Sequence, residues 1–78
     1  MTLLLGVKLS DREQSSVKFQ KILSKYGCNI GARLGLPPKE CQSWGVIILE
    51  VLNKETLSNL ERELITIDNI ELQRMVFN

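Results

Sequence analysis

The chain has no histidine, two cysteines, two prolines and few aromatic residues among its 78 positions. Without histidine it lacks the commonest transition-metal ligand and the side chain best suited to proton transfer near neutral pH. Cys28 and Cys41 have neither the number nor the spacing of a disulfide framework or a C-x-x-C site. We therefore expect free thiols, no metal, no cofactor and no catalytic residue. Free thiols also favour the cytoplasm as the compartment.

Long apolar runs and a strong charge of either sign are also absent. No stretch approaches the roughly 18 apolar residues that a membrane span needs, and the start of the chain has no secretory signal pattern. The formal net charge of +1 gives no long-range field that would attract nucleic acid or anionic lipid. Aromatic residues make up 5% of the chain, too few for the stacking surface of an RNA-binding sheet. We expect binding neither to nucleic acid directly nor to a membrane.

The length allows one domain, residues 1–78, and a domain of this size hides only about 60% of the surface that its unfolded chain exposes. The core of so small a domain rarely contributes more than about 3–5 kcal/mol, so such chains usually add disulfides, a metal or self-association. Because the composition supports neither disulfides nor a metal, we expect a homo-oligomer, either a dimer or a tetramer.

Hydrophobic periodicity in the first third of the chain predicts a strand followed by a helix. Apolar residues alternate over positions 3–9, as in a strand with one buried face. Ser10 and Glu13 have the spacing of a capping box, so a helix is expected over 11–26. Gly27 stands where a residue in the left-handed conformation would end that helix.

Positions 28–36 carry the most regular alternation in the chain and predict a second strand. The odd-even pattern assigns Asn29, Gly31, Arg33 and Gly35 to its outer face. The buried face is then assigned to Cys28, Ile30, Ala32, Leu34 and Leu36, and Cys28 is expected to be packed rather than reactive. Pro37 and Pro38 end the strand, and a loop follows over 39–43.

The second half repeats the order of strand, helix and strand. Residues 44–52 are almost all apolar, as in a central strand, and an outward Glu50 would place Val46 and Ile48 on the same outer face as Leu4. Asn53 is a predicted N-cap for a helix over 54–65, whose inner face is Leu57, Leu60 and Leu64. A turn at 68–69 and a last strand over 70–77 complete the chain.

Together the two halves predict an α+β fold, a ferredoxin-like β-α-β-β-α-β sandwich with an antiparallel sheet in the order 4-1-3-2 and two helices on one face. The other face is then bare. Fully burying a valine or isoleucine is worth about 1.5–3 kcal/mol, so Val46 and Ile48 left in water would together forfeit a stabilisation comparable with that of the whole core. A second copy is the expected cover, and the alternative is that the strand tolerates two exposed aliphatic residues. The candidate oligomer interface is Leu4, Trp44, Val46 and Ile48.

The segment around Arg33 is a candidate binding site because glycines flank the arginine and would leave its guanidinium open to a carboxylate or phosphate. The alternative is a bulged edge strand whose surface arginine pairs with Glu50 or Glu71. The candidate ligand or partner site is Gly31, Arg33, Gly35, Leu36 and Pro37.

The segment GARLGLPPKE at residues 31–40 resembles the iron-only hydrogenase system regulator family, and the order of strands and helices fits that family over almost the whole chain. The family is similar to ACT domains and to the C-terminal domain of nickel-responsive repressors. The resemblance implies an ACT-like, oligomeric regulatory module that responds to a small ligand. Nickel sensing is not implied, because the metal-binding histidines have no counterpart. Neither is amino-acid binding, because the glycine that ACT domains often place between the first strand and the first helix is absent at residues 9–12.

Two classes of function remain open from the sequence. The first is a bacterial, cytoplasmic regulatory module that senses a small ligand or mediates oligomerisation, within the hydrogenase system that the resemblance implies. The second is a purely structural subunit of a homo-oligomer or larger complex without a ligand. We expect no enzyme activity, because no carboxylate pair or activated thiol can be assigned.

Overall fold

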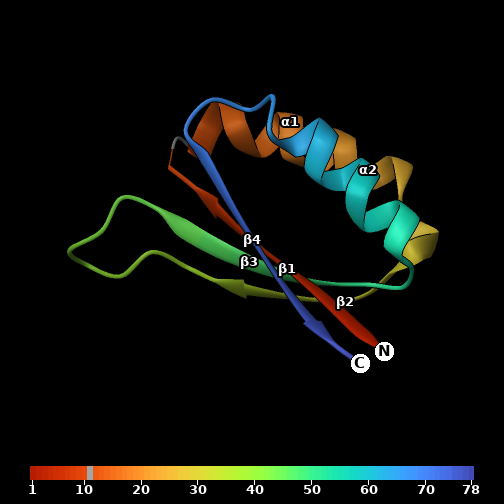
Figure 1. The fold of residues 1–78 in the computed structure, drawn as a ribbon. Coiled ribbons are helices and arrows are strands. Elements are labelled where there is room, and N and C mark those ends of the chain that lie inside the picture. Colours follow the sequence, from red (N-terminus) through yellow and green to blue (C-terminus); the bar gives the residue numbers. More distant parts are fainter. Residues whose placement is uncertain (11) are drawn as a thin grey trace.

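The computed structural model describes the backbone of residues 1–10 and 12–78 and the side chains of residues 1–10 and 15–78. The elements follow one another as β1 (Thr2–Leu9), α1 (Arg12–Lys25), the 3-10 helix η1 (Gly27–Asn29), β2 (Ile30–Leu36), β3 (Gly45–Val51), α2 (Lys54–Leu64) and β4 (Ile70–Phe77). All strand pairs are antiparallel and the sheet order is β2-β3-β1-β4. Both helices lie on one side of the sheet (Figure 1). The predicted ferredoxin-like sandwich and its strand order are confirmed.

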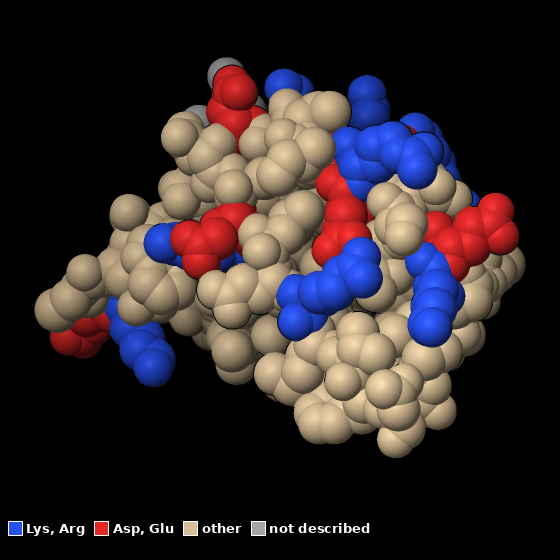
Figure 2. All heavy atoms as spheres, viewed as in Figure 1, with Lys and Arg blue, Asp and Glu red and all other residues tan. Residues whose placement is uncertain are grey.

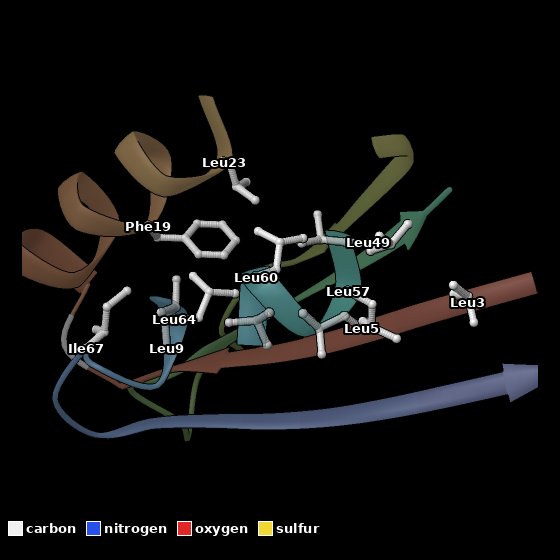
Figure 3. Close-up of a cluster of buried hydrophobic side chains, with 12 residues drawn as sticks. Leu3, Leu5, Leu9, Phe19, Leu23, Leu49, Leu57, Leu60, Leu64 and Ile67 are labelled. Carbon is white, nitrogen blue, oxygen red and sulfur yellow. The ribbon is translucent and has the colours of Figure 1, made fainter. Parts of the chain in front are cut away.

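The core fills the space between the sheet and the two helices, and Figure 3 shows its side chains converging there. It forms because alternate residues of β1 and β3 face the helices, while α1 and α2 turn their apolar stripes toward the sheet. Phe19 of α1 is fully buried at its centre. The buried apolar residues are Leu3, Leu5, Val7, Leu9, Phe19, Leu23, Leu49, Val51, Leu57, Leu60, Leu64 and Ile67.

For α1 the sequence predicted a capping box at the start and a left-handed glycine at the end. The expected capping box lies outside the described residues, because the side chain of Glu13 is among those not described. At the other end, the prediction of a left-handed Gly27 is wrong, since no glycine has a positive φ among the described residues. Instead the chain tightens into η1, in which the Asn29 N–H donates to the Tyr26 carbonyl oxygen at 2.8 Å. The 3-10 turn thus gives a partner to the Tyr26 carbonyl oxygen, one of the carbonyls that the end of a helix leaves without an intrahelical donor.

The start of α2 and the turn before β4 agree with the sequence. The Asn53 side chain accepts a hydrogen bond from the Thr56 N–H at 2.7 Å, as an N-cap does. Asn69 has a φ of 61°, in the left-handed region that asparagine tolerates, and this closes the turn into β4. Neither helix among the described residues has the length and apolarity to cross a membrane.

The second strand begins later than the alternation predicted. Residues 27–29 belong to η1, so Cys28 is not part of β2, and its side chain is exposed rather than packed. The pairing with β3 shifts register between Ile30 and Ala32, because Ile30 pairs with Val51 while Ala32 pairs with the next residue, Glu50. Gly31 is therefore the extra residue of a β-bulge.

This bulge exchanges the two faces of β2. Ile30 packs against the core, but after Gly31 the residues opposite the outward-facing residues of β3 are Leu34, which pairs with Ile48, and Leu36, which pairs with Val46. Directly paired residues share a face of the sheet, so Leu34 and Leu36 lie on the side away from the helices. The prediction that they are buried is wrong, and they are 58% and 48% exposed.

Candidate functional site on the open face of the sheet

We call the side of the sheet without helices the open face. Alternate residues of all four strands lie on it, as the strand pairing requires. Its middle is hollowed into a groove of about 390 Å³. Residues of the open face that line the groove are Leu4, Gly6, Lys8, Trp44, Val46, Ile48, Glu71, Gln73 and Met75.

Gly6 makes this hollow. It lies on central strand β1 between Ile48 and Gln73, its partners on the two neighbouring strands. A Cβ atom at Gly6 would stand 3.6 Å from the Ile48 Cδ1 and 3.6 Å from the Gln73 carbonyl oxygen, which is ordinary contact. The missing side chain therefore leaves space that a neighbouring molecule could fill.

The structure brings the four predicted interface residues together on this face. Leu4, Trp44, Val46 and Ile48 all line the groove, and each is half-buried. The outward Glu50 on β3 and the inward Leu49 and Val51 agree with the predicted orientation of that strand.

Four further large apolar residues lie on the open face, although the sequence did not assign them to it. Two come from β2, where Gly31 was the available signal, since a glycine inside a strand often marks a bulge. Two come from β4, where the pairing places Met75 opposite Leu4 and Phe77 opposite Thr2. In Figure 2 charged side chains gather around the helical layer, while the surface where β1 begins and β4 ends carries few of them. The missed residues are Leu34, Leu36, Met75 and Phe77, each about half exposed.

Charged groups stand at the two ends of the open face. Lys8 lies at the end of β1, with its Nζ 4.5 Å from the centre of the Trp44 ring, a cation-π contact, and its strand neighbours are Val46 and Glu71. Glu50 lies at the opposite end, paired with Leu4 of β1. Within the part of the chain that the structure describes, neither Lys8 nor Glu50 belongs to an ion pair.

Gly31 makes room for Glu50. A Cβ atom at position 31 would stand 2.6 Å from the Glu50 Oε1 and 2.9 Å from the Leu52 Cδ2. The bulge thus lets the carboxylate lie over the backbone of β2. A side chain at position 31 would have to displace the carboxylate, so the glycine serves the packing of this strand pair.

The predicted ligand residues do not form a single pocket. Arg33 pairs with Leu49 and so lies on the helix side of β2, in a hollow of about 210 Å³ bordered by α1. Gly35, Leu36 and Pro37 border a second hollow of about 220 Å³. No carboxylate or thiol is found among the described residues around the Arg33 hollow, whose lining is Gln20, Leu23, Ser24, Gly27, Ile30 and Arg33.

The alternative expected for Arg33 was a bulged edge strand with an ion pair to Glu50 or Glu71. The bulge is present, but the ion pair is not found among the described residues. Glu50 lies on the opposite face of the sheet from Arg33. The ion pairs among the described residues lie on the helix side instead. There Arg74 of β4 holds Glu61 of α2 with two nitrogen donors.

A polar cluster joins the ends of the two helices. Lys25 and Tyr26 both donate to the carboxylate of Glu63. These hydrogen bonds, the one from Lys25 foremost, hold the pKa of Glu63 below its ordinary value. The same contacts with Glu63 raise the pKa of Lys25 and of Tyr26. The cluster lies on the helical layer, so it stabilises the sandwich and is remote from the open face.

No protein-family model and no curated protein matches the chain. Several solved structures, however, are similar to it in fold. An uncharacterized protein from Thermotoga maritima is 21% identical with a TM-score of 0.84, covering 95% of this chain and 92% of its own. The ACT domain of the GTP pyrophosphokinase of Chlorobium tepidum is 20% identical with a TM-score of 0.64, covering 96% of this chain and 100% of its own.

A third similar structure is a dimeric ferredoxin-like protein from an uncultured marine organism, 14% identical with a TM-score of 0.55, covering 99% of this chain and 90% of its own. At these identities the likeness concerns the fold. This chain therefore has an ACT-like variant of the ferredoxin-like fold, as predicted.

Proposed function

We propose that the protein is an oligomeric regulatory module that binds a small ligand and self-associates through the open face of its sheet. The observation that carries this proposal is the uncovered apolar surface around Leu4, Val46 and Ile48, which the bulge enlarges with Leu34 and Leu36. Contiguous apolar surfaces of this kind are typical of interaction sites. The likeness to an ACT domain and to a dimeric protein of the same fold supports the same conclusion.

Burial of this surface has a clear energetic reason. A domain of this size has a marginal core of its own, and each aliphatic side chain moved out of water contributes about 1.5–3 kcal/mol when fully buried. A second copy would bury several of them at once. Association would thus supply stability that the single chain cannot reach.

For the ligand we propose the edge of β2, where Arg33 and the hollow at Gly35, Leu36 and Pro37 are accessible. A guanidinium recognises carboxylates and phosphates through its planar set of donors. A ligand that contacts two copies would favour the assembled form by its difference in affinity for the two states.

Solution mass at micromolar concentration tests self-association. We expect a dimer or tetramer for the natural chain and a monomer for Ile48→Lys, because the substitution puts a charge in the middle of the apolar groove. Lys21→Glu, an exposed position on α1, is the control and should assemble like the natural chain. A monomeric natural chain at all concentrations would refute the proposal.

Thermal melting against a panel of small carboxylates and phosphates tests ligand binding. A ligand should raise the melting temperature of the natural chain, because binding to the folded state stabilises it, and Arg33→Ala should lose that rise. An oligomer that responds to no compound favours the second candidate function, a purely structural subunit, which the apolar open face supports equally well.

A finer assignment, to the regulators of the iron-only hydrogenase system, is proposed on the GARLGLPPKE segment at residues 31–40 and on the matching order of elements. We place the protein in the cytoplasm, which the free thiols of Cys28 and Cys41 support. We propose no catalytic role and no direct contact with nucleic acid. Deleting the gene for this protein in its source organism should change the transcript levels of the iron-only hydrogenase. Unchanged levels would contradict this assignment.

A further inference from the structure

We propose that two copies pack open face to open face about a two-fold axis that runs across the strands, so that Lys8 of each copy meets Glu50 of the other. This inference rests on the self-association proposed above and adds the orientation of the two copies. It follows from where the charges stand on the open face.

The charges are separated along the strands. In the strand pairing, Lys8 lies beside Val46 at one end of the open face, and Glu50 lies beside Leu4 at the other end, four residues further along each strand. Across the strands, Lys8 is flanked by Val46 of β3 and by Glu71 of β4, whereas Glu50 is flanked by Leu4 of β1 and has no cation beside it in the described strands. Neither has an ion partner among the described residues, although each lies on a half-buried surface.

Symmetry allows two simple arrangements of facing sheets, because a closed dimer places the same patch on both copies and facing sheets keep their strands roughly aligned. With the axis along the strands, Lys8 of one copy lies over Val46 of the other, next to the second Lys8, and the two Glu50 residues are likewise neighbours. Like charges would then be buried side by side, which is unfavourable.

With the axis across the strands, the ends of the sheet are exchanged. Lys8 then lies over Leu4 of the second copy, one strand away from its Glu50, a sideways separation of about 5 Å that a lysine side chain can bridge. Opposite charges meet at both ends of the dimer. The same arrangement places Ile48 on Ile48 and Leu34 on Leu34, so apolar residues meet at the centre.

The size of the face also fits a second copy. The sheet has four strands of seven or eight residues, so at about 3.3 Å per residue and about 4.8 Å between strands the open face has an outline of about 25 by 19 Å, to which its side chains add accessible area. A stable protein interface buries about 800 Å² per partner. One copy can therefore cover the open face of another.

Charge reversal tests the orientation. Lys8→Glu should weaken the dimer by about tenfold or more, because the new carboxylate would meet that of Glu50, and Glu50→Lys should do the same by bringing two ammonium groups together. An equimolar mixture of the two variants should recover the affinity of the natural chain to within about threefold, because both contacts of the mixed dimer then join opposite charges. The double variant should recover it as well. Analytical ultracentrifugation measures all four, and circular dichroism confirms that each variant is folded.

Lys21→Glu, the same change on the helical layer, is the control and should leave the affinity unchanged. If both single variants dimerise like the natural chain, the axis does not run across the strands, and this inference is wrong while the proposed self-association stands. If the single variants dimerise weakly and their equimolar mixture does not recover the affinity of the natural chain, this inference is also wrong. A natural chain that stays monomeric defeats the proposed function and this inference together.

Discussion

At the scale of single residues, small chemical differences decide which surfaces the molecule presents. Gly31 adds one residue to β2 and makes room for the Glu50 carboxylate, so the residues that follow face the other way. Gly6 leaves the hollow in the middle of the open face. Glu63 of α2 accepts hydrogen bonds from Lys25 at the end of α1 and from Tyr26, the next residue, and these contacts link the two helices.

Acid should weaken the fold partly through Glu63. Its pKa is lowered in the folded state, so its stabilising contribution is present above the ordinary value of 4.5 and is lost as the pH falls through the folded-state pKa. In Glu63→Gln this contribution is absent at every pH. The free energy of unfolding should therefore fall less steeply below pH 4.5 in the variant than in the natural chain, as urea titrations at several pH values would measure. Glu55→Gln, at an exposed position, controls for the loss of one carboxylate, and identical slopes for Glu63→Gln and the natural chain would contradict the assignment.

At the scale of elements, each helix and strand has its own local cause. Strand β1 follows from alternation, β3 follows from its apolar run with Glu50 setting the outer face, and α2 follows from its apolar stripe and its N-cap. In β2 the local pattern and the pairing with β3 disagree after Gly31, and the pairing decides the outcome. The sequence therefore predicted the strand but assigned its faces wrongly.

Removing the N-cap should destabilise α2. In Asn53→Ala the Thr56 N–H loses its acceptor, which should lower the free energy of unfolding by about 1 kcal/mol. Asn53→Asp keeps an acceptor oxygen and should retain most of the stability. Chemical denaturation of the three proteins, read by circular dichroism, measures the difference, and equal stability of the natural chain and Asn53→Ala would show that the cap is not needed.

A substitution at Leu34 can test which side of the sheet the residues after Gly31 occupy. Because Leu34 lies on the open face and is 58% exposed, Leu34→Ser should change the stability of the dilute monomer by less than about 0.5 kcal/mol. A buried leucine would instead cost about 2–5 kcal/mol. Association should weaken in the same variant, because Leu34 extends the apolar surface. Leu57→Ser, inside the core, provides the contrast and should be strongly destabilised.

At the scale of the whole molecule, the fold has one layer of helices and one sheet, so only one face of the sheet is covered (Figure 1). The apolar residues on the other face were predicted in part, since Leu4, Val46 and Ile48 follow from the alternation of the central strands. Leu34, Leu36, Met75 and Phe77 joined them through the pairing of the edge strands. The predicted ligand residues were scattered because Arg33 and Leu36 are three residues apart in β2, and the alternation of a strand places such residues on opposite faces.

If association covers the open face, thermal stability should depend on concentration. The melting temperature of the natural chain should rise as its concentration increases from the dissociated to the associated range, because the associated state is favoured by mass action. In Ile48→Lys the melting temperature should be independent of concentration. Differential scanning calorimetry over a wide concentration range measures both, and a constant value for the natural chain would argue against association.

The amino-acid sequence by itself determined the elements, their order and the side of each central strand that meets the helices, because alternation, helical spacing and caps act between residues close in the chain. Only the tertiary structure decided the facing of β2 and the full extent of the open face. Those depend on which residues pair across strands, and one extra residue at Gly31, accommodated beside Glu50, reverses every side chain that follows it in the strand.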